Sequence, residues 1–328
     1  MRAVSKTGVA SAADRHGTAI LLATCNGAAF LVEQLHSLQA QADQDWILVV
    51  RDDLSTDTTG NILDDFAAVL GPARIVRLPS GPKRLGAAAN FVALLQAAPA
   101  ARRYAFCDQD DVWLPDKLAR AARLLDREPE ALPALYCARQ RIVDAALRER
   151  DLSPALLRPP SLRNALVQNV ATGCTIVMNE AARQAILAAP APPGTLHDWW
   201  AYLVTTAVGG RVLVDSKPVM LYRQHAGNVV GAVPSVADRA LRALRRGPER
   251  FMRLFMAHVE ALLRHPDLTP DARRLLLELS SLPQAGCFGR LAMLWRSGLY
   301  RQSLPEQAAL YASVALWHAI GNGRARRG

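Results

Sequence analysis

The chain has 328 residues, of which 51% are hydrophobic and 21% are charged, with a formal net charge of +10. This composition is ordinary for a globular enzyme and excludes disorder along most of the chain. It contains no run of 18 apolar residues, so we expect no membrane-spanning helix. Five scattered cysteines without a C-x-x-C spacing indicate reduced thiols in a cytoplasmic protein.

The pattern of apolar residues predicts three regions. Residues 1–17 are polar, lack the apolar core of a signal peptide, and predict a disordered tail. Residues 18–232 carry the strand and helix pattern of a catalytic domain. Gly and Pro interrupt that pattern at 231–235, and residues 233–328 predict a basic helical region.

The first half of the domain alternates short apolar runs with amphipathic helical segments, which is typical of a parallel sheet. The strands that we expect span residues 19–23, 46–50, 74–78 and 104–107. Polar residues follow these strands, notably Thr24 and Asn26 after the first and Asp52 and Asp53 after the second. Because ligands bind at the carboxyl ends of parallel strands, we expect the substrate there.

The strongest chemical signal is the loop Asp108-Gln109-Asp110-Asp111, which directly follows the fourth strand. Three neighbouring carboxylates repel one another unless a cation or hydrogen-bond donors compensate their charge. Mg²⁺ is commonly held by one or two carboxylates together with phosphate oxygens. The loop therefore predicts a metal–diphosphate site, although the same pattern also occurs in solvated loops. Asp52 and Asp53 form a second acidic loop. They either contact the substrate or belong to a helix cap built around Ser55.

The second half predicts further strands at 135–143, 175–178, 211–214 and 219–223. Asp198 lies in the segment His197-Asp198-Trp199-Trp200, where it is either a functional carboxylate or the cap of a helix with core tryptophans. His225 lies in a polar turn after the last strand, and it is either structural or part of the metal site.

The end of the chain is strongly basic. From residue 236 to residue 328 there are 15 arginines, no lysine and 7 acidic residues, a net charge of +8. Such a region either binds nucleic acid, binds the anionic inner face of a membrane, or is simply a solvated charged surface. Aromatic residues there fall among Leu, Ala and Met at helical spacing, which favours a core or a membrane interface over nucleic acid. We expect no nucleic-acid partner and a peripheral contact of the apolar segments 251–263 and 291–299 with the membrane.

Six ordered motifs in residues 18–232 resemble the family 2 glycosyltransferases. They are ILLATCNG at 20–27, VVRDDLSTD at 49–57, LGAAANF at 85–91, FCDQDDVWLPDK at 106–117, LHDWW at 196–200 and YRQHAGNVVG at 222–231. The last two look specifically like those of bacterial rhamnosyltransferases and related polysaccharide-building enzymes. The resemblance implies an α/β fold of the GT-A type, with a Rossmann-like nucleotide-binding half, a mixed central sheet and, here, a C-terminal helical appendage.

Matched position by position, the resemblance also implies roles for single residues. Thr24, Asn26, Asp53 and Asn90 would line the pocket of a nucleotide sugar of the UDP or dTDP type. Asp108 would contact the ribose, and Asp110 with His225 would hold Mg²⁺ or Mn²⁺.

Asp198 is the expected general base, since a carboxylate must take the proton of the acceptor hydroxyl during transfer. With one base and no separate carboxylate nucleophile, we expect inversion at the anomeric carbon. The acceptor would be a glycan or a lipid-linked sugar in cell-surface polysaccharide synthesis. The alternatives are a nucleotidyltransferase, against which the loop at 24–27 argues, and a non-catalytic module that binds carbohydrate or nucleic acid.

Overall fold

The computed structural model describes residues 16–225 and 247–317. Residues 1–15 of the expected tail and the expected boundary after residue 232 lie outside the described residues. The first strand begins at His16, so the last two residues assigned to the tail belong to the sheet.

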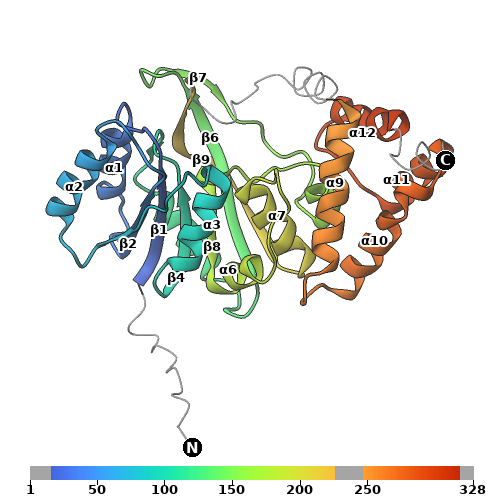
Figure 1. The fold of residues 1–328 in the computed structure, drawn as a ribbon, viewed down its shortest axis with the longest axis horizontal. Coiled ribbons are helices and arrows are strands. Elements are labelled where there is room, and N and C mark those ends of the chain that lie inside the picture. The colour runs from blue at the N-terminus through green and yellow to red at the C-terminus, as the bar shows by residue number, and fades with distance from the viewer. Residues whose placement is uncertain (1–15, 226–246, 318–328) are drawn as a thin grey trace, which may run out of the picture.

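A single mixed sheet of nine strands lies at the centre of the part that the structure describes (Figure 1). The strands are β1 His16–Thr24, β2 Trp46–Asp52, β3 Ile75–Leu78, β4 Ala101–Cys107, β5 Val112–Trp113, β6 Ala134–Val143, β7 Glu149–Leu152, β8 Val177–Asn179 and β9 Arg211–Arg223. Their order is β3-β2-β1-β4-β8-β6-β9-β5, with β7 paired to β6. The first four strands are parallel, and β8 runs antiparallel to β4. The sheet therefore joins a parallel nucleotide-binding type of half to a mixed half, as the sequence predicts.

Helices cover both faces of this sheet, and further helices pack beyond α7 (Figure 1). The helices are α1 Leu31–Gln39, α2 Thr59–Leu70, α3 Ala87–Ala97, α4 Lys117–Leu125, α5 Leu162–Ala165, α6 Glu180–Leu187, α7 His197–Ala207, α9 Pro248–Leu263, α10 Pro270–Ser280, α11 Cys287–Ser297 and α12 Leu304–Leu316. Short 3₁₀ turns occur at Gly173–Thr175 and Leu282–Gln284. None of the helices in the described ranges combines the length and apolarity needed to cross a membrane.

Side chains of β1 point alternately to the two faces of the sheet, and each face has its own apolar core. Ala19 and Leu21 point to the face covered by α3, α6 and α7, while Ile20 and Leu22 point to the face covered by α1, α2 and α4. All four side chains are fully buried. Because a strand buried on both faces reads as a continuous apolar run, this segment is easy to recognise in the sequence.

The C-terminal helices extend the core on the α7 side. Residues of α9 to α12 belong to the same apolar cluster as α3 and α7. His258 of α9 hydrogen-bonds Thr195 just before α7 at 2.9 Å, and His265 contacts the Ala185 carbonyl of α6 at 2.9 Å. These helices thus buttress the side of the sheet that carries α7.

Some local expectations need correction. The two strands expected at 211–214 and 219–223 form one strand, β9, which pairs with β6 through an irregular register near Pro218. Thr175 lies in a 3₁₀ turn, and the strand expected there begins at Val177. This strand ends at Asn179, one residue later than predicted, where the Asn179 side chain caps α6 by accepting the Ala182 N–H at 2.9 Å.

Candidate active site

Three neighbouring parallel strands, β1, β2 and β4, end at the edge of the sheet where the candidate site lies. Their register pairs Thr24 with Asp52 and Leu22 with Cys107, so the loops that follow them lie side by side. Gln109 ties the third loop to the first: it accepts the N–H of Cys25 at 2.8 Å and donates to its carbonyl at 3.1 Å. The sheet assembles the polar loops as the sequence predicts.

Thr24 and Asn26 join the first loop to the second. Thr24 is buried and donates its hydroxyl to Asp52 at 2.8 Å. Asn26 adopts a left-handed conformation with φ of 51°, which asparagine tolerates better than most residues. Its N–H donates to Ser55 at 2.7 Å and its side-chain oxygen accepts the Thr56 N–H at 2.8 Å. Ser55 therefore braces this loop, and the helix α2 begins only at Thr59.

Asp53 and Asn90 belong to one buried network behind these loops. Asp53 accepts the backbone N–H groups of Leu85 and Gly86, both at 2.8 Å, and pairs with Arg51 at 3.2 Å. Burial raises the pKa of Asp53, but these donors outweigh burial and lower the pKa overall. Asn90 accepts from Arg51 at 2.8 Å. Asp53 thus fixes the turn before α3, and its expected contact with a nucleobase stays a prediction.

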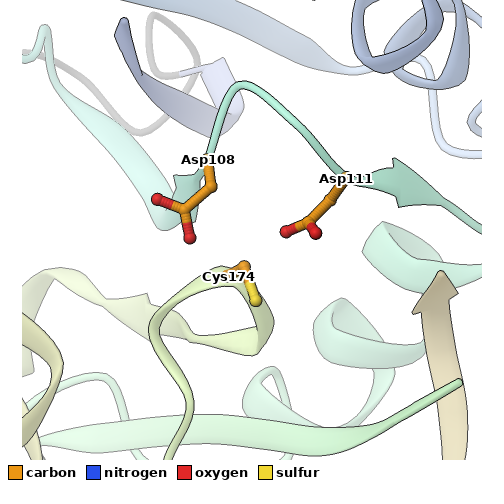
Figure 2. A group of neighbouring side chains, drawn as sticks. All are labelled: Asp108, Asp111 and Cys174. Atoms are coloured by element: carbon orange, nitrogen blue, oxygen red, sulfur yellow. The ribbon is translucent and has the colours of Figure 1, made fainter. Parts of the chain in front are cut away.

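The acidic loop after β4 concentrates negative charge in a confined space. Asp108 and Asp110 are partly exposed, whereas Asp111 is fully buried. In Figure 2, Asp108 and Asp111 point toward Cys174, and one ligand atom of each of the three lies within 4.8 Å of the others. Burial and the charge of Asp110 raise the pKa of Asp108 to about 7, and the same causes raise the pKa of Asp111.

Burial is the larger cause of these raised pKa values, and the mutual repulsion of the carboxylates adds to it. One oxygen of Asp111 accepts the Arg223 N–H at 3.1 Å, and its other oxygen is buried without a hydrogen bond from a nitrogen or oxygen donor among the described residues. A divalent cation would relieve this repulsion, and clustered carboxylates are the ligands that Mg²⁺ and Mn²⁺ prefer. The residues present therefore fit such an ion.

The two residues expected to hold the metal lie in contact. His225 Nε2 is 2.8 Å from the Asp110 carboxylate, and the imidazole packs on Phe30 with ring centroids 4.8 Å apart. Both side chains are mostly buried, with 19% and 16% of their surfaces exposed. The turn after β9 thus meets the loop after β4 at the expected point.

Arg223, which belongs to the motif at 222–231, lies beneath the acidic loop. Its side chain is 1% exposed. It donates to the Asp110 carbonyl at 2.8 Å, to the Ala145 carbonyl, and to Glu33. Arg223 therefore orders the backbone of the loop.

Lys117 is a buried cation that sequence reasoning missed. Its ammonium donates to the Cys174 carbonyl at 2.5 Å and lies 3.2 Å from the centroid of a Trp113 ring. Burial lowers its pKa to about 8, and the charges of Asp111 and Asp108 act against that shift. Lys117 thus supplies part of the charge that the loop needs. The signal in the sequence that could have identified Lys117 is its place in the motif at 106–117.

Asp198 lies in the first turn of α7 and faces the same site. Its carboxylate accepts the Gly173 N–H at 3.1 Å and the Trp199 N–H at 2.6 Å, and 8% of the residue is exposed. Burial raises the pKa of Asp198 to about 6. Gly173, which donates to Asp198, is followed by Cys174, whose Sγ lies within 4.8 Å of an Asp108 carboxylate oxygen, so both carboxylates lie beside the same turn.

The neighbours of Asp198 are packing residues. Trp200 is 2% exposed, and Trp199 donates to the Ala165 carbonyl at 2.7 Å. His197 stacks on Phe91 with ring centroids 4.0 Å apart, and burial lowers its pKa to about 3, so the ring is neutral. A Cβ at Gly173 would lie 2.9 Å from His197 Nε2. Glycine at 173 lets the backbone approach close enough to hold Asp198.

Known proteins are similar to this chain in sequence or in fold. The model of glycosyl transferase family 2 matches residues 19–187. A dTDP-rhamnosyl transferase of Shigella flexneri, RfbG, is 32% identical over 233 residues, which cover 64% of this chain and 74% of the relative.

Solved structures agree on the fold. TarS from S. aureus in complex with UDP-GlcNAc has a TM-score of 0.58 at 18% identity, covering 90% of this chain and 79% of that one. The mannosyltransferase PcManGT from Pyrobaculum calidifontis, in complex with GDP-Man and Mn²⁺, has a TM-score of 0.53 at 18% identity, covering 92% and 80%. The GT-A fold expected from the sequence is confirmed.

Proposed function

The chain belongs to glycosyl transferase family 2, and we propose that it moves a sugar from a nucleoside diphosphate to a hydroxyl of a glycan or lipid-linked acceptor. Rhamnose carried on dTDP is the proposed donor, with UDP sugars next, because the relative from Shigella flexneri is named for dTDP-rhamnose transfer. The pathway that we propose is cell-surface polysaccharide synthesis. The observation that supports the proposal is the contact of His225 with Asp110, in the loop that follows β4, beside the ends of β1 and β2.

For the donor, we propose a nucleotide pocket lined by the loops after β1 and β2. Thr24 and Asn26 would shape its wall through their contacts with Asp52, Ser55 and Thr56. Asp53 and Asn90 would act from behind by fixing the turn before α3, and Asp108 would meet the ribose. The side chains of Thr24, Asn26, Asp53 and Asn90 are already hydrogen-bonded, so this part of the pocket would need little rearrangement on binding.

Asp110 and His225 would hold Mg²⁺ or Mn²⁺, with Asp108 and Asp111 adding negative charge nearby. When bound, the ion would neutralise the charge that builds on the departing diphosphate. Arg223 holds the Asp110 backbone in place, and Lys117 limits the repulsion among the carboxylates. The protein contributes a loop of fixed shape whose negative charge Lys117 offsets only in part.

Asp198 would act as the general base. Its two hydrogen bonds from Gly173 and Trp199 fix the carboxylate, and its pKa of about 6 makes it ionised yet basic near neutral pH. It would take the proton of the acceptor hydroxyl while the hydroxyl oxygen attacks the anomeric carbon from the face opposite the diphosphate. A single displacement of this kind inverts the anomeric configuration.

We propose three functional regions: a tail at 1–17, the transferase domain at 18–232, and a helical region at 233–328 that supports α7 and meets an anionic membrane on its cytoplasmic face. A lipid-linked acceptor would reach the enzyme there.

The full chain incubated with a panel of nucleotide sugars tests the proposed activity. We expect one dTDP or UDP sugar to release free nucleoside diphosphate only when Mg²⁺ or Mn²⁺ is present. Release of pyrophosphate from a nucleoside triphosphate and a sugar phosphate would overturn the proposal and favour a nucleotidyltransferase.

A further inference from the structure

Helix α11 presents aromatic side chains to solvent on the side that faces away from the core. Its core side carries Met293 and Leu294, which are 8% and 1% exposed. Phe288 and Trp295, in contrast, are 88% and 75% exposed, and Ala292 lies exposed between them. Residues four and three positions apart share one face of a helix. These three residues form what we name the aromatic face of α11.

The aromatic face corrects the expectation about which residues meet a membrane. The apolar sides of segments 251–263 and 291–299 are mostly in the core: Phe255, Leu262 and Leu294 are all nearly inaccessible. Trp317, which follows α12, is also buried. Within residues 16–225 and 247–317, the large apolar rings that are strongly exposed are those of Phe288 and Trp295. Exposed apolar patches commonly mark an interaction site.

Charge around this face favours an anionic partner. Helix α11 contains two arginines and no acidic residue: Arg290 is buried, whereas Arg296, directly beside Trp295, has 62% of its side chain exposed and lies 3.6 Å from Glu278 of α10. Arg273 and Arg274 are exposed on α10, which packs against α11, and Arg274 pairs with Asp271. The two helices together contain four arginines and two acidic residues, a net charge of +2. Figure 1 shows α11 at the end of the molecule opposite α1 and α2.

We propose that the aromatic face of α11 inserts into the headgroup region of an anionic lipid bilayer. Trp and Phe favour this interfacial region, and arginines nearby attract anionic headgroups. A second copy of the chain is a poorer occupant, since two arginine-rich regions would repel each other. The inference rests on the proposed function in that a lipid-linked acceptor would lie in the same surface, and it names the residues that make the contact.

Vesicle co-sedimentation of the full chain tests this inference. The vesicles are phosphatidylglycerol mixed with phosphatidylethanolamine, and phosphatidylcholine alone as the uncharged comparison. The test variant is Phe288→Ser with Trp295→Ser. The matched control is Val69→Ser, which replaces an apolar residue that is 72% exposed on α2, at the other end of the molecule. Since all three side chains are exposed, thermal melts should match wild type.

We expect wild type and Val69→Ser to bind the anionic vesicles and to bind phosphatidylcholine weakly. The double variant should lose at least about tenfold in its partition coefficient, because two large side chains no longer enter the interface. The inference is overturned if wild type does not bind anionic vesicles, or if the double variant binds them with the same partition coefficient as wild type. If wild type forms a dimer, the double variant is monomeric and neither binds vesicles, the inference is overturned and a second copy of the chain is the occupant of the aromatic face.

Donor hydrolysis without vesicles separates this inference from the proposed function. The double variant should release nucleoside diphosphate at the wild-type rate, because α11 does not contribute to the candidate site. Loss of vesicle binding with normal hydrolysis in the double variant supports the inference. Absence of hydrolysis in wild type would contradict the proposed function. Vesicle binding would then still test the inference about the aromatic face independently.

Discussion

His225 Nε2 lies 2.8 Å from Oδ2 of Asp110, although the two residues are 115 positions apart in the chain. One comes from the turn after β9 and the other from the loop after β4. Phe30 packs on the imidazole and Arg223 holds the Asp110 backbone, so the contact is supported from two sides. This pair is the part of the structure on which the proposed metal site most depends.

Asp198→Asn should abolish transfer while leaving donor binding intact. The amide cannot take a proton from the acceptor, and we expect kcat to fall by about a thousandfold. Binding of the nucleotide sugar, measured by calorimetry, should change little because Asp198 would meet the acceptor. Equal losses of donor affinity and of kcat would instead assign Asp198 to the donor site.

The transfer rate should depend on pH through Asp198. Burial raises its pKa to about 6, so a growing fraction of the carboxyl is protonated, and unable to act as a base, as pH falls below that value. We expect the single-turnover rate at saturating donor to rise with pH through about 6 and to level off above it. A rate that stays constant from about pH 5 to about pH 7, roughly one unit to either side of this midpoint, would speak against this assignment.

Arg223→Met should destabilise the protein and weaken donor binding. It leaves the Asp110 and Ala145 carbonyls without their donor and removes the partner of Glu33. We expect the free energy of unfolding to fall by roughly 3 kcal/mol, measured by urea denaturation. Arg274→Met is the control, because its pair with Asp271 is exposed and should contribute less than about 1 kcal/mol. Indistinguishable midpoints for the two variants would show that Arg223 does not order the loop.

Gly173→Ala should lower kcat with little effect on donor affinity. The added Cβ would lie 2.9 Å from His197 Nε2 and 3.4 Å from Asp198 Cβ, so the turn or α7 must shift. A displacement of the base by a fraction of an ångström should cost roughly tenfold in kcat. Gly60→Ala is the control, since nothing lies within 4 Å of its added Cβ. A normal kcat in Gly173→Ala would mean that the site tolerates movement of Asp198.

The nucleotide-binding half of the fold was readable from the sequence because its signals are local. Buried parallel strands give unbroken apolar runs such as residues 19–23, and polar loops follow them directly. The Asp110–His225 contact was also anticipated, but through resemblance to a family, because no local pattern predicts a contact between residues so far apart.

Other features depend on packing that a sequence does not display. Asp53 binds the turn at Leu85 and Gly86, a contact between two loops that only the folded sheet brings together. Arg223 looked like a site residue by position, yet its guanidinium turns under the loop. The sequence also could not show that Trp295 is exposed and Trp317 is buried, because both residues follow similar apolar patterns, one in α11 and the other at the end of α12.

Calorimetric titration of a nucleoside diphosphate, dTDP or UDP, with and without Mn²⁺, tests the central claim most directly. We predict that wild type and Asp271→Asn, which alters an exposed carboxylate on α10, bind the nucleotide far more tightly when Mn²⁺ is present. Asp110→Asn should lose that metal-dependent gain, with affinity lowered by about a hundredfold. An Asp110→Asn variant that keeps the full effect of Mn²⁺ would contradict the account, because the acidic loop would then not hold the ion that binds the diphosphate.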